Sequence, residues 1–221
     1  DHEDCVTVEA AQCDNNTCVP CTTDDHCAGV ADNPRCYDET DPNRCANCTV
    51  AEDSACDSVG ECDPGSFDCV SRTIGNGDLC DPCSSDSDCG KYMRCVPMNF
   101  GSGGSTTDVG SYCLQLYATN QDSFLQDCPR PYSSLVARDS VDGATALYCS
   151  LDESLTTCPA VGDLLAEKDC QVGSQVCGAS GVDDGDCVTG GSLITTCSYE
   201  CDSNADCPTG FNCGTQGNCI R

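Results

Sequence analysis

The sequence lacks the residues from which a large hydrophobic core is built. It contains no tryptophan, four phenylalanines and seven tyrosines among 221 residues. A chain so poor in large apolar side chains buries too little surface to offset the entropy that it loses on folding. We therefore expect small domains that are held together by covalent cross-links.

Positive charge is also scarce, and this excludes several classes of partner. The chain has nine Lys and Arg residues and 37 Asp and Glu residues, which gives a formal net charge of −28. Nucleic acids require basic surfaces, and anionic membranes repel acidic proteins, so we expect protein partners. No run of about 20 apolar residues is present, which predicts no membrane insertion. The absence of an apolar leader is expected of a mature secreted chain.

The sequence contains no pattern that is typical of an enzyme. Of the two histidines, His2 lies in an acidic tail, and His26 lies in a loop whose two other copies carry Asp88 and Asp206 instead. A general base would not occupy so interchangeable a position. Phosphate-binding and dinucleotide-binding motifs are absent. We predict a protein that is not an enzyme and uses no cofactor.

What the sequence does contain is cysteine, with 27 residues of this type. Twenty-seven cysteines among 221 residues exceed the roughly 8–10% of the chain that indicates a disulfide scaffold. So high a cysteine content predicts an extracellular or cell-surface location. The alternative use is metal binding, because Cys18–Cys21, Cys45–Cys48 and Cys80–Cys83 are Cys-x-x-Cys pairs. The matching pair Cys197–Cys201 encloses three residues, however. A disulfide scaffold tolerates that change better than a metal site does.

The cysteines follow three runs with similar spacing, which predicts tandem repeats. We expect cysteine-rich repeats at residues 1–50, 51–117 and 168–221, with a cysteine-poor insertion at 118–167. The runs are Cys5, Cys13, Cys18, Cys21, Cys27, Cys36 and Cys45; Cys56, Cys62, Cys69, Cys80, Cys83, Cys89, Cys95 and Cys113; and Cys170, Cys177, Cys187, Cys197, Cys201, Cys207, Cys213 and Cys219.

The expected fold is a tandem of small disulfide-rich modules, mostly loops and short β-hairpins with little helix, in an elongated molecule. Within the insertion, Asp142-Gly143 is a hairpin signal, and Pro159 opens a short helix that reaches Lys168. Residues 101–107 are predicted to form a flexible loop. The expected strands lie at 114–117, 134–138 and 144–149.

Each repeat contains one similar loop, namely Cys21–Cys27, Cys83–Cys89 and Cys201–Cys207. Its Ser, Thr, Asp and Asn residues favour a tight turn or a single capped helical turn. The alternative is a carboxylate contact to calcium, although each loop has too few oxygen ligands. Elsewhere, the strongest calcium candidates are Asp183, Asp184 and Asp186, which equally form an acidic turn.

Because 27 is odd, one cysteine lacks a partner within the chain. If the second and third repeats each close four bridges, the cysteines outside the runs can make two more, and seven remain in the first repeat. We expect the missing partner upstream in a longer parent chain or on a neighbouring molecule, the alternative being a free or capped thiol. The four cysteines outside the runs are Cys48, Cys128, Cys149 and Cys158.

Two Asn-x-Thr triplets, at Asn15 and Asn47, are candidate glycosylation sites. The second overlaps Cys48 and is therefore the poorer acceptor.

The rhythm Cys201-x5-Cys207-Pro-Thr-Gly-x2-Cys213-x5-Cys219 resembles small extracellular four-disulfide modules of the whey-acidic-protein and dickkopf-like class. It also resembles the acidic cysteine-rich domains of diatom cell-wall proteins. The acidic stretch Asp86–Cys89 resembles these domains more than it resembles the whey-acidic-protein and dickkopf-like class. This resemblance implies small extracellular modules and assigns no functional residue.

Together these features predict a secreted structural or interaction protein, such as a cell-surface coat, an adhesive or an extracellular filament subunit. The alternatives are a secreted protease inhibitor or ligand-binding module that presents a loop such as Gly101–Asp108, and an acidic calcium-binding matrix protein.

Overall fold

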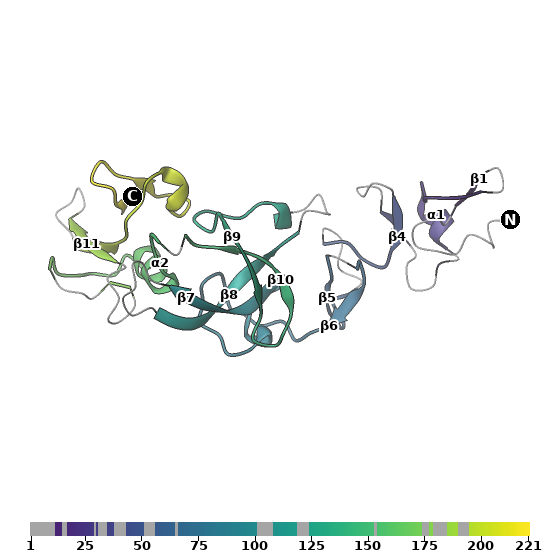
Figure 1. Cartoon of the computed structure of the whole chain (residues 1–221), viewed down its shortest axis with the longest axis horizontal. Coiled ribbons are helices and arrows are strands. Elements are labelled where there is room, and N and C mark those ends of the chain that lie inside the picture. Colours follow the sequence, from purple (N-terminus) through teal and green to yellow (C-terminus); the bar gives the residue numbers. More distant parts are fainter. Residues whose placement is uncertain are drawn as a thin grey trace. The chain divides into compact units, whose positions relative to one another are not determined.

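The computed structural model divides the chain into two compact units (Figure 1). Unit 1 comprises Asp1–Ile74 and Ala118–Asp127, and unit 2 comprises Gly75–Tyr117 and Cys128–Arg221. The residues that the structure describes are 12–14, 17–28, 30, 35–37, 43–50, 56–64, 66–100, 108–118, 124–152, 154–173, 177–178, 185–189 and 195–221.

Unit 1 is built from small antiparallel hairpins rather than from one sheet. Its described hairpins pair β1 with β2, β3 with β4 and β5 with β6. Two of the hydrophobic clusters among its described residues consist of cysteines, joined by Val30 in one of them, and a third pairs Ala46 with Phe67. Sulfur therefore takes the place of a conventional core in this unit. The elements are β1 Gln12–Asp14, β2 Thr17–Val19, α1 Asp24–Cys27, β3 Arg35–Tyr37, β4 Arg44–Ala46, β5 Gly60–Cys62, β6 Cys69–Ser71 and the 3-10 helix η4 Phe124–Gln126.

Unit 2 contains a four-stranded antiparallel sheet in the order β7-β8-β10-β9. The long hairpin of β7 (Met93–Phe100) and β8 (Asp108–Tyr117) supplies one half of the sheet. The hairpin of β9 (Ser134–Asp139) and β10 (Thr145–Ser150) supplies the other half. Its turn is closed by the Gly143 N–H, which donates to the Ser140 carbonyl at 3.0 Å, with Gly143 at φ +90. The hairpin predicted around Asp142-Gly143 is thus confirmed.

Helix α2 (Cys158–Leu165) packs against the same core. The Thr157 hydroxyl caps it by accepting from the Ala160 N–H at 3.3 Å. The helix predicted to reach Lys168 ends three residues earlier, and Glu167 adopts φ +48, a left-handed conformation that does not continue a helix. The remaining elements are η3 Asp86–Asp88, β11 Asp186–Thr189, β12 Thr195–Ser198, η5 Asn204–Asp206, β13 Asn212–Cys213 and β14 Cys219–Ile220.

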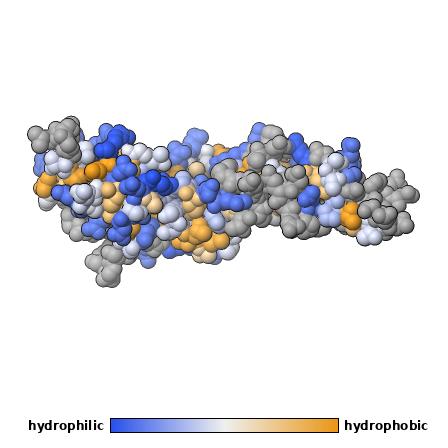
Figure 2. Space-filling model, turned by 90° about the horizontal axis from the view of Figure 1, so that it is seen from above, coloured by the Kyte–Doolittle hydropathy of each residue, from blue (hydrophilic) through white to orange (hydrophobic). Residues whose placement is uncertain are grey.

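Unit 2 has the one large apolar cluster among the described residues. The cysteine-poor insertion contributes eight of its 18 buried residues, including Tyr148, Leu151 and Val161, and the β7–β8 hairpin contributes five, including Val96 and Leu114. The face of the molecule in Figure 2 is largely hydrophilic, with apolar residues in small groups.

The fold class predicted from the sequence is confirmed, since the described residues form many disulfides, small sheets, loops and two α-helices. The elongated shape and the bounds predicted for the three repeats and the insertion stay predictions, and the predicted loop at 101–107 lies outside the described residues. No helix in the described ranges is long and apolar enough to cross a membrane.

Candidate functional site

Ten of the twelve disulfides in the described residues follow one rule. In each set of four successive cysteines, the first bonds the third and the second bonds the fourth. We call such a set a four-cysteine module. The five modules are Cys21–Cys45, Cys48–Cys69, Cys83–Cys113, Cys170–Cys197 and Cys201–Cys219.

Each module is organised by a hairpin that carries its third and fourth cysteines. These two cysteines are direct Cα partners in the antiparallel ladder, so their side chains lie on one face with Cβ atoms about 4.5–5.5 Å apart. The segment with the first and second cysteines then bonds both sulfurs on that face. The opposed pairs are Cys36 and Cys45, Cys62 and Cys69, Cys95 and Cys113, Cys187 and Cys197, and Cys213 and Cys219.

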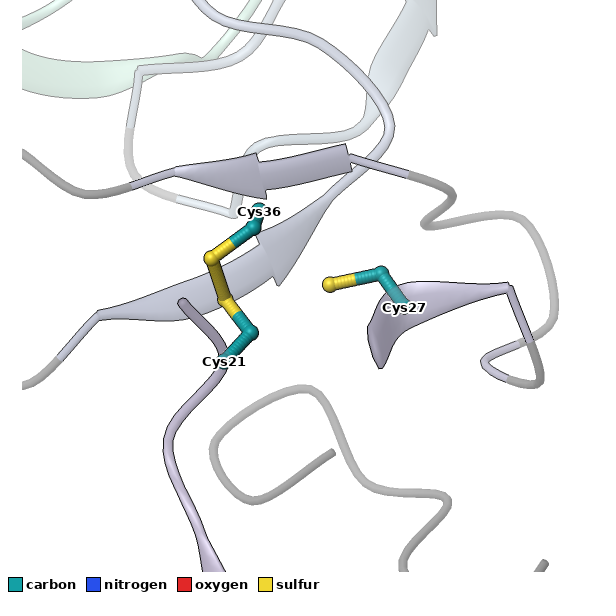
Figure 3. Close-up of side chains that lie close together, drawn as sticks. All are labelled: Cys21, Cys27 and Cys36. Atoms are coloured by element: carbon teal, nitrogen blue, oxygen red, sulfur yellow. A yellow bond between two sulfur atoms is a disulfide. The ribbon is translucent and has the colours of Figure 1, made fainter. Parts of the chain in front are cut away.

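Figure 3 shows this arrangement in the first of the five modules. A disulfide joins Cys21 to Cys36, and the side chain of Cys27 points toward it. The three sulfur atoms lie within 4.8 Å of one another. The two bridges of a module therefore form one compact sulfur cluster, which fills the space that apolar side chains fill in a larger domain.

The loop between the first and second cysteines forms a single helical turn in three modules, as the sequence predicts. The turns are α1, η3 and η5. In the second of these, Asp88 Oδ2 accepts from the N–H groups of Ser84 and Ser85 at 2.8 and 3.0 Å. These two backbone hydrogen bonds lower the pKa of Asp88 below its ordinary value.

His26 has the same structural role as the acids at the matching positions. Its Nδ1 accepts from the Thr22 N–H at 3.2 Å, as Asp206 Oδ2 accepts from the Asp202 N–H at 3.0 Å. Each acceptor closes the turn over four residues. This explains in physical terms why a histidine and an aspartate occupy equivalent positions.

Asp86 joins the module Cys83–Cys113 to the β9–β10 hairpin. Its Oδ1 accepts from the Cys95 N–H at 3.0 Å and its Oδ2 from the Ser140 hydroxyl at 2.8 Å. Asp142 Oδ2 in turn accepts from the Asp86 N–H at 2.8 Å. Both carboxylate oxygens of this buried residue are thus bound by protein donors, where the sequence had left a calcium contact open. The buried network was not predicted, because two of its members, Ser140 and Asp142, lie more than 50 residues from Asp86.

The two cysteines of a Cys-x-x-Cys sequence take part in two different disulfides. Cys45 bonds Cys27, whereas Cys48 bonds Cys62. Likewise, Cys83 bonds Cys95, whereas Cys80 bonds Cys158. The two sulfurs of each such pair belong to different disulfides. They therefore do not form a two-thiolate metal hook, which would require both as free thiolates.

Two bridges stand outside the modules, and they correct our expectation for the extra cysteines. Of the four cysteines outside the runs, only Cys128 and Cys149 bond each other. Cys158 bonds Cys80, 78 residues away, and Cys48 is the first cysteine of a module. The prediction that the second run closes four bridges within itself is therefore wrong. The third run, Cys170–Cys219, does close four.

The other predicted site residues are described only in part. Asp183, Asp184 and Asn15 lie outside the described residues, as do residues 101–107 of the predicted presenting loop Gly101–Asp108. Asp186 Oδ2 accepts from the Asn218 side chain at 2.7 Å. Asn47 is half-buried, and its side-chain amide lies 3.7 Å from Cys69 Sγ. Calcium binding and glycosylation stay predictions.

A scan of family models, a search of curated proteins and a search of solved structures found no match to this chain. The resemblance to whey-acidic-protein, dickkopf-like and diatom cell-wall modules accordingly stays a prediction.

Proposed function

We propose that this chain is a secreted, non-enzymatic structural protein, such as a subunit of a cell-surface coat, an adhesive layer or an extracellular filament. Its dense disulfide bonding is of the kind that persists in oxidising surroundings. Each module encloses its own two cross-links, so it resists unfolding without a large core. Mechanical and chemical endurance is the property that this construction supports best.

One observation carries the proposal, namely that the cysteines are odd in number and that the module rule leaves one cysteine of the β1–β2 hairpin without a partner among them. Cys13 and Cys18 are direct partners on β1 and β2, as the third and fourth cysteines are in the five modules. Cys18 is disulfide-bonded. By the module rule, Cys18 pairs with the second cysteine, Cys5, and Cys13 pairs with a first cysteine. No cysteine precedes Cys5 in this sequence.

We therefore assign the odd cysteine to Cys13 and propose that its partner lies on another molecule. The N-terminal module is then completed by a cross-link between molecules. A protein whose folding unit is completed in this way is suited to a continuous covalent structure.

Disulfide mapping of the native protein tests this proposal. The protein is digested with pepsin at acidic pH, where few thiolates are present to exchange disulfides, and the fragments are analysed without reduction. We expect Cys5 linked to Cys18, and Cys13 linked to a cysteine outside this sequence or to a second copy. A reactive Cys13 thiol, or one capped only by a small thiol, overturns the proposal.

A matched pair of variants separates the cross-link from folding. We expect Cys13→Ser to keep the twelve bridges of the described residues and to abolish covalent oligomers on non-reducing gels. Cys18→Ser removes a bridge that lies within the chain, so covalent oligomers persist. Electron microscopy of native material completes the test, because filaments or layers support a structural role, whereas dispersed single particles contradict it.

A further inference from the structure

One disulfide in unit 2 can open without taking a module apart. The Cys80–Cys158 bridge stands outside the five modules, so each module keeps both of its cross-links when this bond breaks. The backbone around Cys80 is held independently of its sulfur, because the Cys80 N–H donates to the Cys113 carbonyl and the Asp81 carbonyl accepts from the Cys113 N–H, each at 2.9 Å. Helix α2, which begins at Cys158, stays packed in the apolar cluster of unit 2 through Val161.

The two sulfur atoms of this bridge are suited to different parts in thiol–disulfide exchange. Cys80 is half-buried, so an incoming thiolate reaches the bond from its side, whereas Cys158 is 2% exposed. Cys158 is also the first residue of α2, and the partial positive charge at a helix N-terminus stabilises a cysteine thiolate. A thiol whose thiolate is stabilised leaves faster. Exposure and leaving ability therefore both direct attack to the sulfur of Cys80.

The other described bridges lack this combination. Among the described helices, α2 alone begins with a cysteine. In each module, three sulfur atoms from both bridges lie within 4.8 Å of one another, so the neighbouring bridge restricts the directions of attack. The remaining bridge outside the modules joins Cys128 to Cys149, which is 0% exposed within β10 and has no helix N-terminus to stabilise its thiolate. Cys80–Cys158 is thus the bridge best built for exchange.

We infer that Cys80 of one copy of this chain is the point at which Cys13 of a second copy becomes attached. This inference rests on the proposed function and names the partner cysteine within it. The Cys13 thiolate bonds Cys80 Sγ, the Cys80–Cys158 bond breaks, and its electron pair leaves on Cys158 Sγ, which then takes up a proton. One thiol and one disulfide are consumed and one of each is formed, so the reaction needs no oxidant.

Each copy carries both groups that this reaction requires. Cys13 lies on β1 in unit 1, and Cys80 belongs to unit 2. A contact between two different surfaces extends into an open chain of subunits unless its rotation closes a ring. A bond between two Cys13 residues, by contrast, would end at a dimer and would need an oxidant. Exchange at Cys80 therefore provides the repeating covalent link that a filament requires.

Disulfide mapping of the covalent oligomers tests the link directly. The oligomers of the full chain are treated with N-ethylmaleimide, digested with pepsin at acidic pH and analysed without reduction. We expect Cys13 linked to Cys80 and Cys158 carrying N-ethylmaleimide. A Cys13–Cys13 link, a link from Cys13 to a different protein, or an intact Cys80–Cys158 bridge in every subunit overturns this inference. The first two outcomes leave the proposed function standing.

A matched pair of double variants tests the acceptor bridge. Cys80→Ala/Cys158→Ala removes this bridge and keeps all five modules, and it should reduce covalent oligomers on non-reducing gels at least tenfold. Cys128→Ala/Cys149→Ala removes the other bridge outside the modules and should form covalent oligomers as the parent does. Equal oligomer yields from the two variants contradict the inference.

A small thiol tests the same bridge without removing any of its cysteines. Asp78 and Asp81 lie close to Cys80 in the sequence, so cationic cysteamine is a suitable probe. In a Cys13→Ser background, we expect cysteamine to bond Cys80 and to free Cys158 at least tenfold faster than it opens any module. Attachment at Cys158, or earlier opening of a module, overturns this inference. The proposed function would then still depend on the mapping of Cys13 and on microscopy.

Discussion

The module Cys201–Cys219 allows a matched measurement of what a buried disulfide contributes. Its two bridges each span 12 residues, so loss of either cross-link costs a similar chain entropy, about 3 kcal/mol. Their burial differs, however. Cys207 and Cys219 are 0% and 1% exposed, whereas Cys213 is only half-buried. Replacing each pair by alanine therefore compares two equal loops in two different environments.

We expect the Cys207→Ala/Cys219→Ala variant to be the less stable one. Removal of two buried sulfurs leaves a cavity whose lost contacts add about 1–2 kcal/mol, for a total of about 4–5 kcal/mol. The Cys201→Ala/Cys213→Ala variant should lose about 3 kcal/mol, since water reaches part of the vacated space.

Guanidinium unfolding of the two variants measures this difference. Tyrosine fluorescence reports on the region, since Tyr199 is fully buried in the same apolar cluster. Mass spectrometry without reduction serves as the control that the other bridges are unchanged. Equal losses of unfolding free energy, or a larger loss for Cys201 and Cys213, would refute the idea that these modules use sulfur as their core.

Three further predictions concern other side chains. Glu61 is 1% exposed and forms two hydrogen bonds with Arg72. Glu61→Gln should therefore lower the free energy of unfolding in denaturant by about 3 kcal/mol, whereas replacing both residues by methionine should lower it less, and equal losses would contradict a buried ion pair. His26→Asp keeps the acceptor that closes the turn and should leave the melting temperature nearly unchanged, whereas His26→Leu should lower it. Equal effects of the two substitutions would show that the hydrogen bond from Thr22 does not stabilise the protein. Burial raises the pKa of Tyr132 and of Tyr148 from 10.0 to about 12, so their stabilising contribution, complete below pH 10, should fall as pH rises from 10 to 12. In a phenolate absorbance titration both should ionise near pH 12 in the native protein and near pH 10 in urea, and ionisation near pH 10 in both states would contradict the burial.

Local signals in the sequence predicted the elements whose causes are local. Asp142-Gly143 forces a hairpin, and Pro159 begins a helix, because backbone geometry alone restricts those residues. The strand predicted at 114–117 is part of the longer β8, which begins at Asp108. The first half of β8 was not predicted, because it pairs with β7 on the other side of the glycine-rich stretch 101–107. Packing and the Cys89–Cys113 bridge determine that pairing, and strand propensity does not.

The cysteine spacing suggested repetition but did not predict which cysteines pair. Taking Cys56 as a first cysteine left Cys48 unassigned, whereas the structure makes Cys48 the first member and Cys56 the second. Eight cysteines allow 105 pairings, and gaps within these modules vary too much for spacing to choose among them. The long-range Cys80–Cys158 bridge had no local signal at all. Only the opposed positions of third and fourth cysteines on each hairpin reveal the rule.

The module rule also explains how so acidic a chain remains folded. In a conventional domain, charges that repel one another oppose a hydrophobic core held by many weak contacts. Here each module is held together by its own covalent bonds, so surface residues can become acidic without unfolding it. The same independence lets neighbouring modules follow one another closely, as Cys45 and Cys48 do with two residues between them. Covalent closure within modules thus lets the surface residues of each module change without loss of its interior.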